Sequence, residues 1–154
     1  RSSSANSTGW TPITFDESEE NHLQQPHEDP FLITARIGQY DMSRVLIDGG
    51  SAVNVLFHPA YKQLERHSSK LIQDHEPLLS FSGDITQPLG SDTITLILGT
   101  HPQCAQLDTE FIVVDCPSSY NAILGRPALC RLKCIIAYHM LIMKLPTPAG
   151  TATI

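Results

Sequence analysis

Short apolar runs separated by turn-forming residues fill the chain from residue 31 onward, and this pattern predicts strands rather than long helices. The expected strands are 31–37, 40–47, 53–57, 78–81, 93–98, 107–114, 120–124 and 135–145. Two other segments, 59–66 and 126–133, favour short helices, because each carries a proline in its first turn. Seven or more strands with two short helices predict an all-β domain.

The two ends of the chain lack this pattern. Residues 1–29 are rich in serine, threonine and acidic side chains, and such a composition cannot bury enough apolar surface to offset chain entropy. We therefore expect a flexible polar and acidic linker at 1–29, in which Trp10, Ile13 and Phe15 are candidates for a short docked segment. The folded domain is expected at 30–148, followed by a tail at 149–154.

Length and charge narrow the range of functions. The chain has 154 residues, which is enough for one domain with a sizeable core. Its 16 acidic and 10 basic side chains give a net charge of −6, which argues against direct nucleic-acid binding, since phosphate contacts require clustered cations. No apolar stretch approaches the roughly 20 residues that a membrane helix needs, so we expect no membrane partner.

The cysteines and the start of the chain bear on its location. Four cysteines are too few for a disulfide scaffold, and we expect reduced thiols in the cytoplasm. The chain starts at Arg1 without a signal-peptide pattern, which predicts a piece of a longer intracellular protein. Cys130, Cys134 and His139 have a spacing conceivable for zinc, but they lack a paired set of four ligands. We expect free thiols, and neither a metal nor another cofactor.

Two apolar strands that run into glycine resemble each other. Residues 45–50 (VLIDGG) and 122–125 (AILG) are each followed within a few residues by a stretch compatible with a helix. Two similar halves related by a pseudo-twofold axis would produce this echo, although strands of many β-proteins end at glycine.

Asp48 stands at the end of the first of these strands. An Asp-Gly pair is typical of a two-residue hairpin turn. However, the runs on both sides, 45–47 and 53–57, are apolar, and a carboxylate between buried strands is costly unless it is hydrogen-bonded or functional. The glycines that follow let backbone N–H groups approach the carboxylate closely. On the residues alone, a turn and a functional carboxylate both remain open.

Three segments, in order, resemble retropepsin-like aspartic peptidases. Residues 46–51 (LIDGGS) are similar to the family's signature of two apolar residues, Asp, Thr or Ser, and Gly. Residues 111–114 (FIVV) and then 121–126 (NAILGR) resemble its second signature, in which two apolar residues and Gly precede a short helix. Residues 81–90 lie where the family has its flap hairpin. The resemblance covers about 30–148. The overall sequence pattern of this segment is similar to that of the peptidase segment in gag–pol polyproteins of plant gypsy-type LTR retrotransposons.

The resemblance implies a fold, an activity and a set of site residues. The fold would be a retropepsin-like closed β-barrel with a flap hairpin, forming one half of a twofold dimer. The activity would be that of an aspartic endopeptidase, in which Asp48 from each copy of a homodimer activates water. The substrate would be an extended peptide or polyprotein, in the cytoplasm or within virus-like particles. The other implied residues are the active-site loop Gly49, Gly50 and Ser51, the flap and substrate-binding residues Ser82, Gly83, Asp84 and Ile85, and the second signature Ile123, Leu124, Gly125 and Arg126.

The chain departs from the family's pattern at Gly49, where Thr or Ser is usual. In the family that hydroxyl bonds across the dimer axis, so its absence predicts a weaker dimer. Ser51 offers a hydroxyl two positions later, and Ala52 stands where some members carry a charge for the counterpart of Arg126. Two functions therefore compete. One is an aspartic endopeptidase that processes a retrotransposon polyprotein, and the other is a catalytically weak or inactive peptidase-like module that dimerises or binds peptide.

Overall fold

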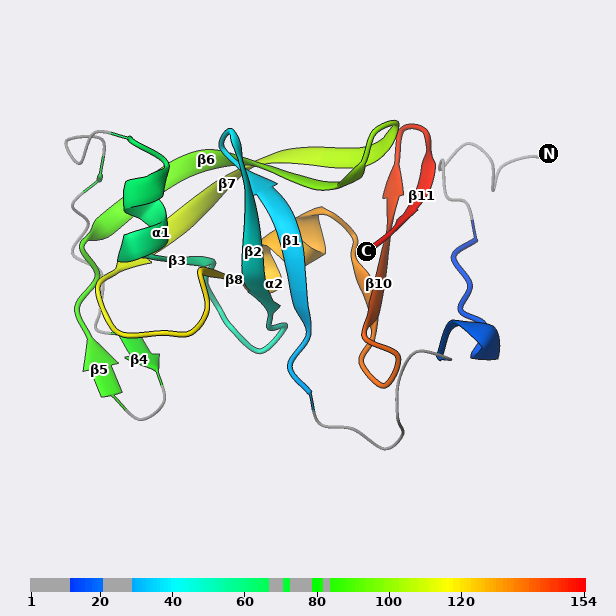
Figure 1. Ribbon diagram of the computed structural model, residues 1–154, viewed down its shortest axis with the longest axis horizontal. Coiled ribbons are helices and arrows are strands. Elements are labelled where there is room, and N and C mark those ends of the chain that lie inside the picture. The colour runs from blue at the N-terminus through cyan, green and yellow to red at the C-terminus, as the bar shows by residue number, and fades with distance from the viewer. Residues whose placement is uncertain (1–11, 21–28, 67–70, 73–78, 82–83) are drawn as a thin grey trace.

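The computed structural model describes residues 12–20, 29–66, 71–72, 79–81 and 84–154 (Figure 1). Two α-helices are present in this part of the chain, α1 (His58–Gln63) and α2 (Arg126–Arg131), together with the 3-10 helix η2 (Glu17–Glu20). The strands are β1 (Leu32–Ile37), β2 (Tyr40–Ile47), β3 (Val55–Phe57), β4 (Leu79–Phe81), β5 (Asp84–Thr86), β6 (Gly90–Thr100), β7 (Gln103–Val114), β8 (Ala122–Leu124), β9 (Ile135–Ala137), β10 (Ile142–Thr147) and β11 (Gly150–Thr153).

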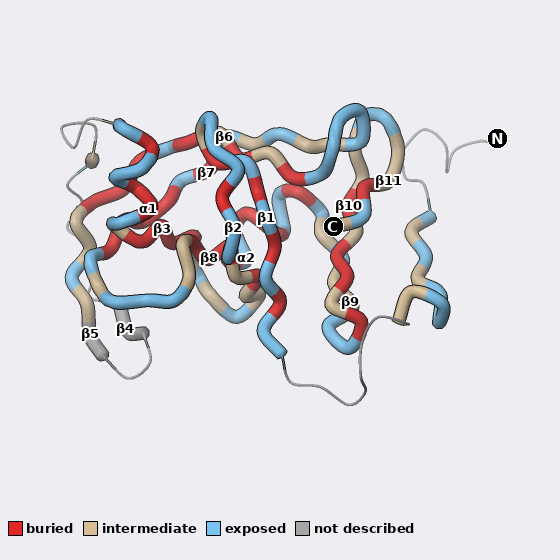
Figure 2. Tube along the Cα trace, in the orientation of Figure 1, coloured by how far each residue is buried: buried red, intermediate tan, exposed pale blue. Residues whose placement is uncertain are grey.

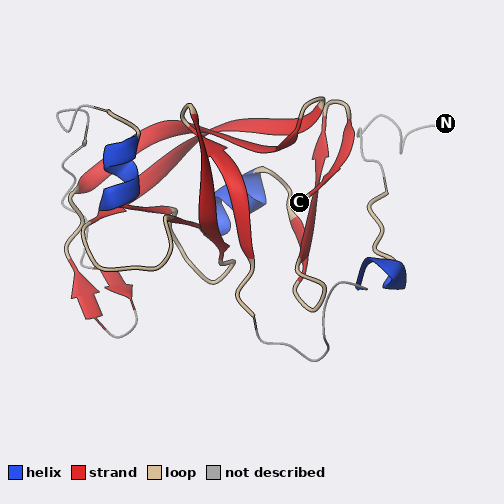
Figure 3. Ribbon diagram, viewed as in Figure 1, coloured by secondary structure: helices blue, strands red, loops and turns tan. Residues whose placement is uncertain are grey.

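Six strands close into a barrel in the order β1, β2, β8, β3, β7 and β6, and β6 pairs with β1 to complete the circle. Alternation along β1 turns Ile33, Ala35 and Ile37 into the core, because successive side chains of a strand point to opposite faces. Buried residues gather along the barrel strands in Figure 2, and Figure 3 shows strands throughout with only short helices. The all-β closed-barrel fold expected from the sequence is confirmed.

The longest pairing in the barrel is the antiparallel hairpin of β6 and β7. It runs from the pair Gly90 and Val113 to the pair Thr100 and Gln103 without interruption. The sequence predicts shorter strands at 93–98 and 107–114, because the outer ends of both strands carry polar residues. Backbone pairing carries these polar ends beyond the barrel, where β7 contacts β10 and β11 (Figure 1).

A three-stranded sheet of β9, β10 and β11 follows the barrel. The sequence predicts one strand at 135–145, but a turn divides this segment. The Met140 N–H donates to the Ala137 oxygen at 3.1 Å, and Leu141 adopts a positive φ of 52°. Tyr138 and His139 briefly interrupt the apolar run, but the apolar residues Met140 and Leu141 resume at once, so the pattern does not separate two strands. The last strand, β11, pairs with β10 inside the segment 149–154 that the sequence assigns to a tail, and it buries Ala152.

Residues 12–20 lie against this C-terminal sheet. The ammonium of Lys144 donates to the backbone oxygen of Thr14 at 2.7 Å, pairs with the Glu19 carboxylate at 3.0 Å, and lies 4.8 Å from the centre of the Phe15 ring. Hydrogen bonding from the Asp16 backbone, and then from Lys144, lowers the pKa of Glu19. His139 Nε2 lies 2.9 Å from Glu20 Oε1. Phe15 thus belongs to a docked segment, while Trp10 lies outside the described residues.

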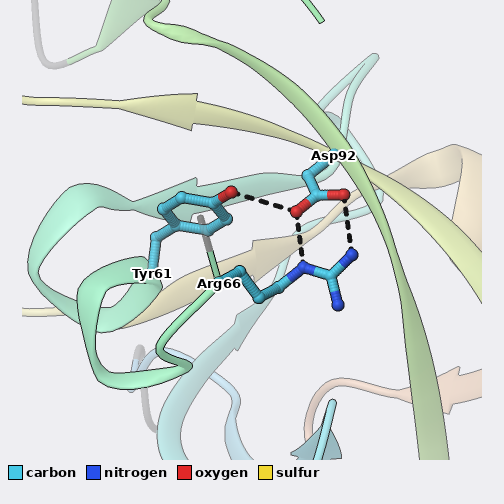
Figure 4. A network of polar contacts seen from close by, with 3 residues as sticks. All are labelled: Tyr61, Arg66 and Asp92. Carbon is cyan, nitrogen blue, oxygen red and sulfur yellow. Dashed lines mark hydrogen bonds and ion pairs between the residues drawn. The ribbon is translucent and has the colours of Figure 1, made fainter. Parts of the chain in front are cut away.

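A buried polar network joins α1 to β6 (Figure 4). Asp92, only 5% exposed, accepts hydrogen bonds from Arg66 Nε at 2.6 Å, from Arg66 Nη2 at 3.1 Å and from the Tyr61 hydroxyl at 3.0 Å. Burial, and then the hydrogen bond to Asp92, raises the pKa of Tyr61 to about 12. The folded state therefore holds the phenol proton more tightly than the unfolded chain, and this contribution to stability is lost as pH rises from 10 towards 12.

We expect Asp92→Asn to destabilise the fold by about 3 kcal/mol, because it leaves the Arg66 charge without its carboxylate in a mostly buried setting. The matched control is Asp41→Asn, which breaks an exposed pair with Arg36 at 3.3 Å. That change should cost about 0.5 kcal/mol or less, since water screens exposed pairs. Urea unfolding monitored by circular dichroism measures both. Equal costs for the two variants would contradict the structural role of the Asp92 network.

Candidate active site

Asp48 lies where β2 leaves the barrel, directly beside the end of β8. The two strands are parallel neighbours, with Val45, Leu46 and Ile47 paired with Ala122, Ile123 and Leu124. The pairing continues one residue further, because the Asp48 N–H donates to the Leu124 oxygen at 3.0 Å. The two sequence segments that echo each other are therefore adjacent and in register. The Asp48 side chain emerges half-exposed from a buried strand.

The loop after Asp48 folds back on its own carboxylate. The Gly50 N–H donates to Asp48 Oδ1 at 2.9 Å, and the Ser51 N–H donates to the Asp48 backbone oxygen at 3.1 Å. Because Gly50 has no side chain, its N–H can approach the carboxylate closely. The Ser51 hydroxyl donates to the Val53 oxygen at 2.7 Å and so closes the loop on its far side. These bonds orient the carboxylate, and within the described part of the chain no hydrogen bond engages its other oxygen atom.

Arg126, at the start of α2, binds the same loop. Its backbone N–H donates to the Ser51 oxygen at 2.9 Å, and its side-chain Nε donates to the Gly49 oxygen at 3.3 Å. Arg126, in the second signature, thus holds the loop of the first signature by binding two of that loop's backbone carbonyl oxygens. This finding supplies the partner for Arg126 that the sequence could not name. A charged residue at position 52 is not needed for these contacts, and Ala52 is exposed.

Asn54 is a residue of this site that the sequence analysis did not single out. It is 5% exposed, its Oδ1 accepts the Gly125 N–H at 2.9 Å, and its Nδ2 donates to the Glu110 oxygen at 3.2 Å. A buried side-chain amide needs such partners to offset its loss of water. The available signal was a polar residue inside the apolar run 53–57, but its partners are distant in sequence and cannot be read from it.

Gly125 allows α2 to pack directly on the Asp48 loop. A Cβ at this position would overlap the Val53 carbonyl oxygen and would lie 2.8 Å from the Ser51 oxygen. Gly49 is different. Among the described residues, and apart from its two chain neighbours, a Cβ there would lie within 4 Å of one atom, the Tyr138 hydroxyl oxygen at 3.5 Å, and Gly49 is not among the glycines with a positive φ. The backbone therefore requires glycine at 125 but does not require it at 49.

The hairpin expected as a flap is present as a separate two-stranded sheet. β4 pairs with β5 in antiparallel register, with Leu79 opposite Thr86 and Phe81 opposite Asp84. Asp84 and Ile85 are the first residues of β5, and the turn residues Ser82 and Gly83 lie outside the described residues. The structure thus brings Asp48, Gly49, Gly50 and Ser51 together with Leu124, Gly125 and Arg126. Ile123 is buried beside β3, where it pairs with Val55.

The residues that the structure describes contain no group of three or more metal-ligating side chains. Burial, and then the nearby Cys130, raises the pKa of the Cys134 thiol to about 12, so this sulfur holds its proton at neutral pH. His139 is close to Glu20. In the same described part of the chain, no helix has the length and apolarity needed to cross a membrane.

Comparison with known proteins identifies the fold. No protein-family model matches the sequence, and no curated protein matches it either. Among solved structures, the EIAV protease in complex with the inhibitor HBY-793 superimposes with a TM-score of 0.54 and 20% identity, covering 75% of this chain and 99% of that one. The retroviral protease-like domain of Ddi1 from Leishmania major gives a TM-score of 0.58 at 10% identity, covering 83% and 96% of the two chains.

A third solved structure, a retropepsin-like aspartic protease from Rickettsia conorii, gives a TM-score of 0.57 at 17% identity, covering 81% of this chain and 86% of that one. A viral, a eukaryotic and a bacterial protein thus share this architecture with the chain. The class that the fold defines is the retropepsin-like aspartic protease fold. Identities of this size establish the fold alone, and activity must be argued from the site.

The contrast between the two glycines generates a test. We expect Gly125→Ala to destabilise the fold by about 3 kcal/mol, because the new methyl group overlaps backbone that cannot move without breaking the Asp48 loop. The matched control, Gly49→Ala, should leave stability unchanged or raise it by about 0.5 kcal/mol, through lower entropy of the unfolded chain. Urea unfolding measures both changes. A neutral Gly125→Ala variant would contradict the tight contact of α2 with the loop.

Proposed function

We propose that this chain is an aspartic endopeptidase in which Asp48 is the catalytic carboxylate. The observation that carries the proposal is the geometry of the Asp48 loop. A half-exposed carboxylate is held at the end of a barrel strand by the Gly50 N–H, and its loop is held in turn by Arg126. A turn with no further role would not need two buried anchors, Asn54 and Gly125, beneath it. The likeness of the fold to retropepsin-like proteases supports the same conclusion.

The active site is completed by a second copy of the chain. Peptide hydrolysis by this chemistry needs two carboxylates, and two other aspartates of the described residues are engaged elsewhere. Asp92 is buried against Arg66 and Tyr61, and Asp108 accepts a hydrogen bond from Thr95 at 3.0 Å. A twofold axis next to Asp48 brings two identical loops together. The proposed functional unit is therefore a homodimer.

The proposed reaction divides the work between the two carboxylates. Like charges a few Å apart cannot both ionise, so the pair holds one proton at working pH. The ionised carboxylate takes a proton from water, and that water attacks the carbonyl carbon of the peptide. The protonated carboxylate then donates its proton, and the amine leaves as the C–N bond breaks. The substrate is an extended peptide, which would pair with the protein backbone as an added strand. The β4–β5 hairpin would cover this peptide.

The biological substrate that we propose is the polyprotein of a retrotransposon, which the domain would cut from within, in the cytoplasm or in virus-like particles. The sequence resemblance of residues 30–148 to the peptidase of gypsy-type polyproteins supports this proposal. A second function, a module that dimerises or binds peptide without cleaving it, is favoured by Gly49. The decisive experiment is incubation of the purified protein with a mixed peptide library between about pH 4 and pH 7, where a carboxylate pair holds one proton.

We expect Asp48→Asn to lower the rate of cleavage by at least about a hundredfold, the usual contribution of general acid–base catalysis. The asparagine side chain keeps an oxygen acceptor for the Gly50 N–H, so the fold should persist. Mass spectrometry of the peptide library measures the rate, and circular dichroism checks the fold. The matched control is Asp108→Asn, an exposed aspartate outside the site that should retain full activity. Cleavage by Asp48→Asn at the wild-type rate would exclude Asp48 as the catalyst, whereas no cleavage by the wild type would favour the binding module.

If the active unit is a homodimer, an inactive chain should abolish the activity of the wild-type chain with which it pairs. With a ninefold excess of Asp48→Asn chains, random pairing should reduce cleavage by a fixed amount of wild type to about a tenth, because most wild-type chains then sit in mixed dimers with one catalytic carboxylate. A ninefold excess of unrelated protein serves as the control. Activity that does not respond to the mutant chain would show that a single copy is sufficient.

A further inference from the structure

The strand that leads to Asp48 contains a β-bulge. At Ser43 and Arg44, two residues of β2 lie opposite a single residue of β1, and the register of the pair shifts by one residue. Arg44 adopts a positive φ of 51°, which is unfavourable for residues other than glycine. A strained residue of this kind persists only where the surrounding structure holds it in place. The bulge is therefore expected to be fixed by specific contacts.

The bulge determines the face of β2 on which the later side chains emerge. Met42 and Val45 are both buried in the core although they are three residues apart, because the bulge adds one residue to the alternation. Without that residue, the even-numbered side chains from Met42 to Asp48 would all face the core. With it, Val45 and Ile47 fill the core. Alternation then places the Asp48 side chain on the opposite face of the strand.

Two side chains tie the bulge to the segment that enters β8. Arg44 Nε donates to the Ser119 oxygen at 2.9 Å, and Arg44 Nη2 lies 3.5 Å from Asn121 Oδ1. In return, the Asn121 N–H donates to the Arg44 oxygen at 3.0 Å, and Asn121 Nδ2 donates to the Ser43 oxygen at 2.7 Å. Each side chain thus binds the backbone of the other segment, across separations of 75 to 78 residues in the sequence.

These contacts lie at the entrance to the parallel pairing of β2 with β8, whereas Asp48 lies at its exit. The pairing starts with Val45 opposite Ala122 and ends with Ile47 opposite Leu124. Because every residue of β8 is apolar and buried, a shifted register would still bury apolar side chains, and hydrophobicity alone discriminates little between registers. Directional hydrogen bonds at the entrance can select one of them.

We propose that Arg44 and Asn121 are positioning residues that form a register clamp, which fixes the bulge of β2 against the start of β8 and so sets the face and the neighbours of Asp48. This inference rests on the proposed function, because the carboxylate that the clamp positions is the proposed catalytic group. The clamp acts through the backbone, from the opposite end of the strand pair. Its loss should reduce the fraction of molecules with a correctly placed carboxylate, and should therefore lower turnover more than substrate binding.

The central test is Arg44→Gly, because glycine adopts a positive φ without strain but lacks the clamping side chain. Relief of strain should offset part of the lost bonding, so the midpoint of urea unfolding should stay close to that of the wild type. The value of kcat should fall about tenfold, while KM changes by less than about twofold. Hydrogen exchange of the Asp48 amide, which donates to the Leu124 oxygen, should become about tenfold faster.

The matched control is Glu65→Gly, which replaces another non-glycine residue with a positive φ, 55°, outside the site. It should change neither kcat nor the exchange rate of the Asp48 amide. Asn121→Ala removes the other half of the clamp and should reproduce both effects of Arg44→Gly. Because the two changes break the same contact, the double variant should lose at most about twofold beyond the worse single variant, whereas independent effects would multiply to about a hundredfold.

Several results would overturn the clamp. These are an effect of only one of the two single changes, a multiplied loss in the double variant, or faster exchange that extends equally through β6 and β7, which would indicate general destabilisation. If the wild type cleaves peptide and both variants match its kcat, the proposed function stands and the clamp fails. If the wild type cleaves no peptide, the proposed function fails, and exchange of the Asp48 amide alone decides whether the clamp sets the register.

Discussion

The parallel pairing of β2 with β8 is the constraint on which the rest of the site depends. Parallel strands cannot be joined by a tight turn, so the chain must run through most of the barrel before the second strand arrives beside the first. Once Ile47 is paired with Leu124, the next residues on both strands leave the sheet at the same edge. That edge is where Asp48 meets Gly125. The register of one strand pair thus places the carboxylate beside the start of α2.

The loop at this edge is held through its own backbone groups, and this explains which of its side chains it can do without. Arg126 reaches the Ser51 and Gly49 oxygens, and Asn54 fixes the Gly125 N–H from below. None of these contacts uses a side chain at position 49 or 52. The residues that cannot be exchanged are those whose size determines the packing, above all Gly125, where a side chain would overlap neighbouring backbone. Such a conformation tolerates changes in the side chains at positions 49 and 52 but not in the packing at Gly125.

The sequence predicts the barrel well, because its strands alternate or are continuously apolar and their ends carry turn residues. β1, β2 and both helices follow from such local patterns. The turn at 138–141 does not, because Met140 and Leu141 are as apolar as the strands beside them. The partners of Asn54 and Arg126 were also hidden, since each bond joins segments that only the folded barrel brings together. The Asp48 loop could be located from sequence, but what holds it could not.

Gly49 is the residue that distinguishes the two competing functions, the enzyme and the binding module. The structure changes how strongly this glycine argues against the enzyme. If the loop had required a positive φ at this position, glycine would have marked a loop of a different shape, and the resemblance to retropepsins would have lost its central residue. The backbone there is instead one that other residues adopt, and beyond its chain neighbours a Cβ would contact no described residue except Tyr138, at an ordinary distance of 3.5 Å. The glycine at position 49 therefore does not by itself indicate a loop of a different shape. The fold still presents the Asp48 carboxylate at the end of its barrel strand, and this carboxylate remains the basis for the proposed function.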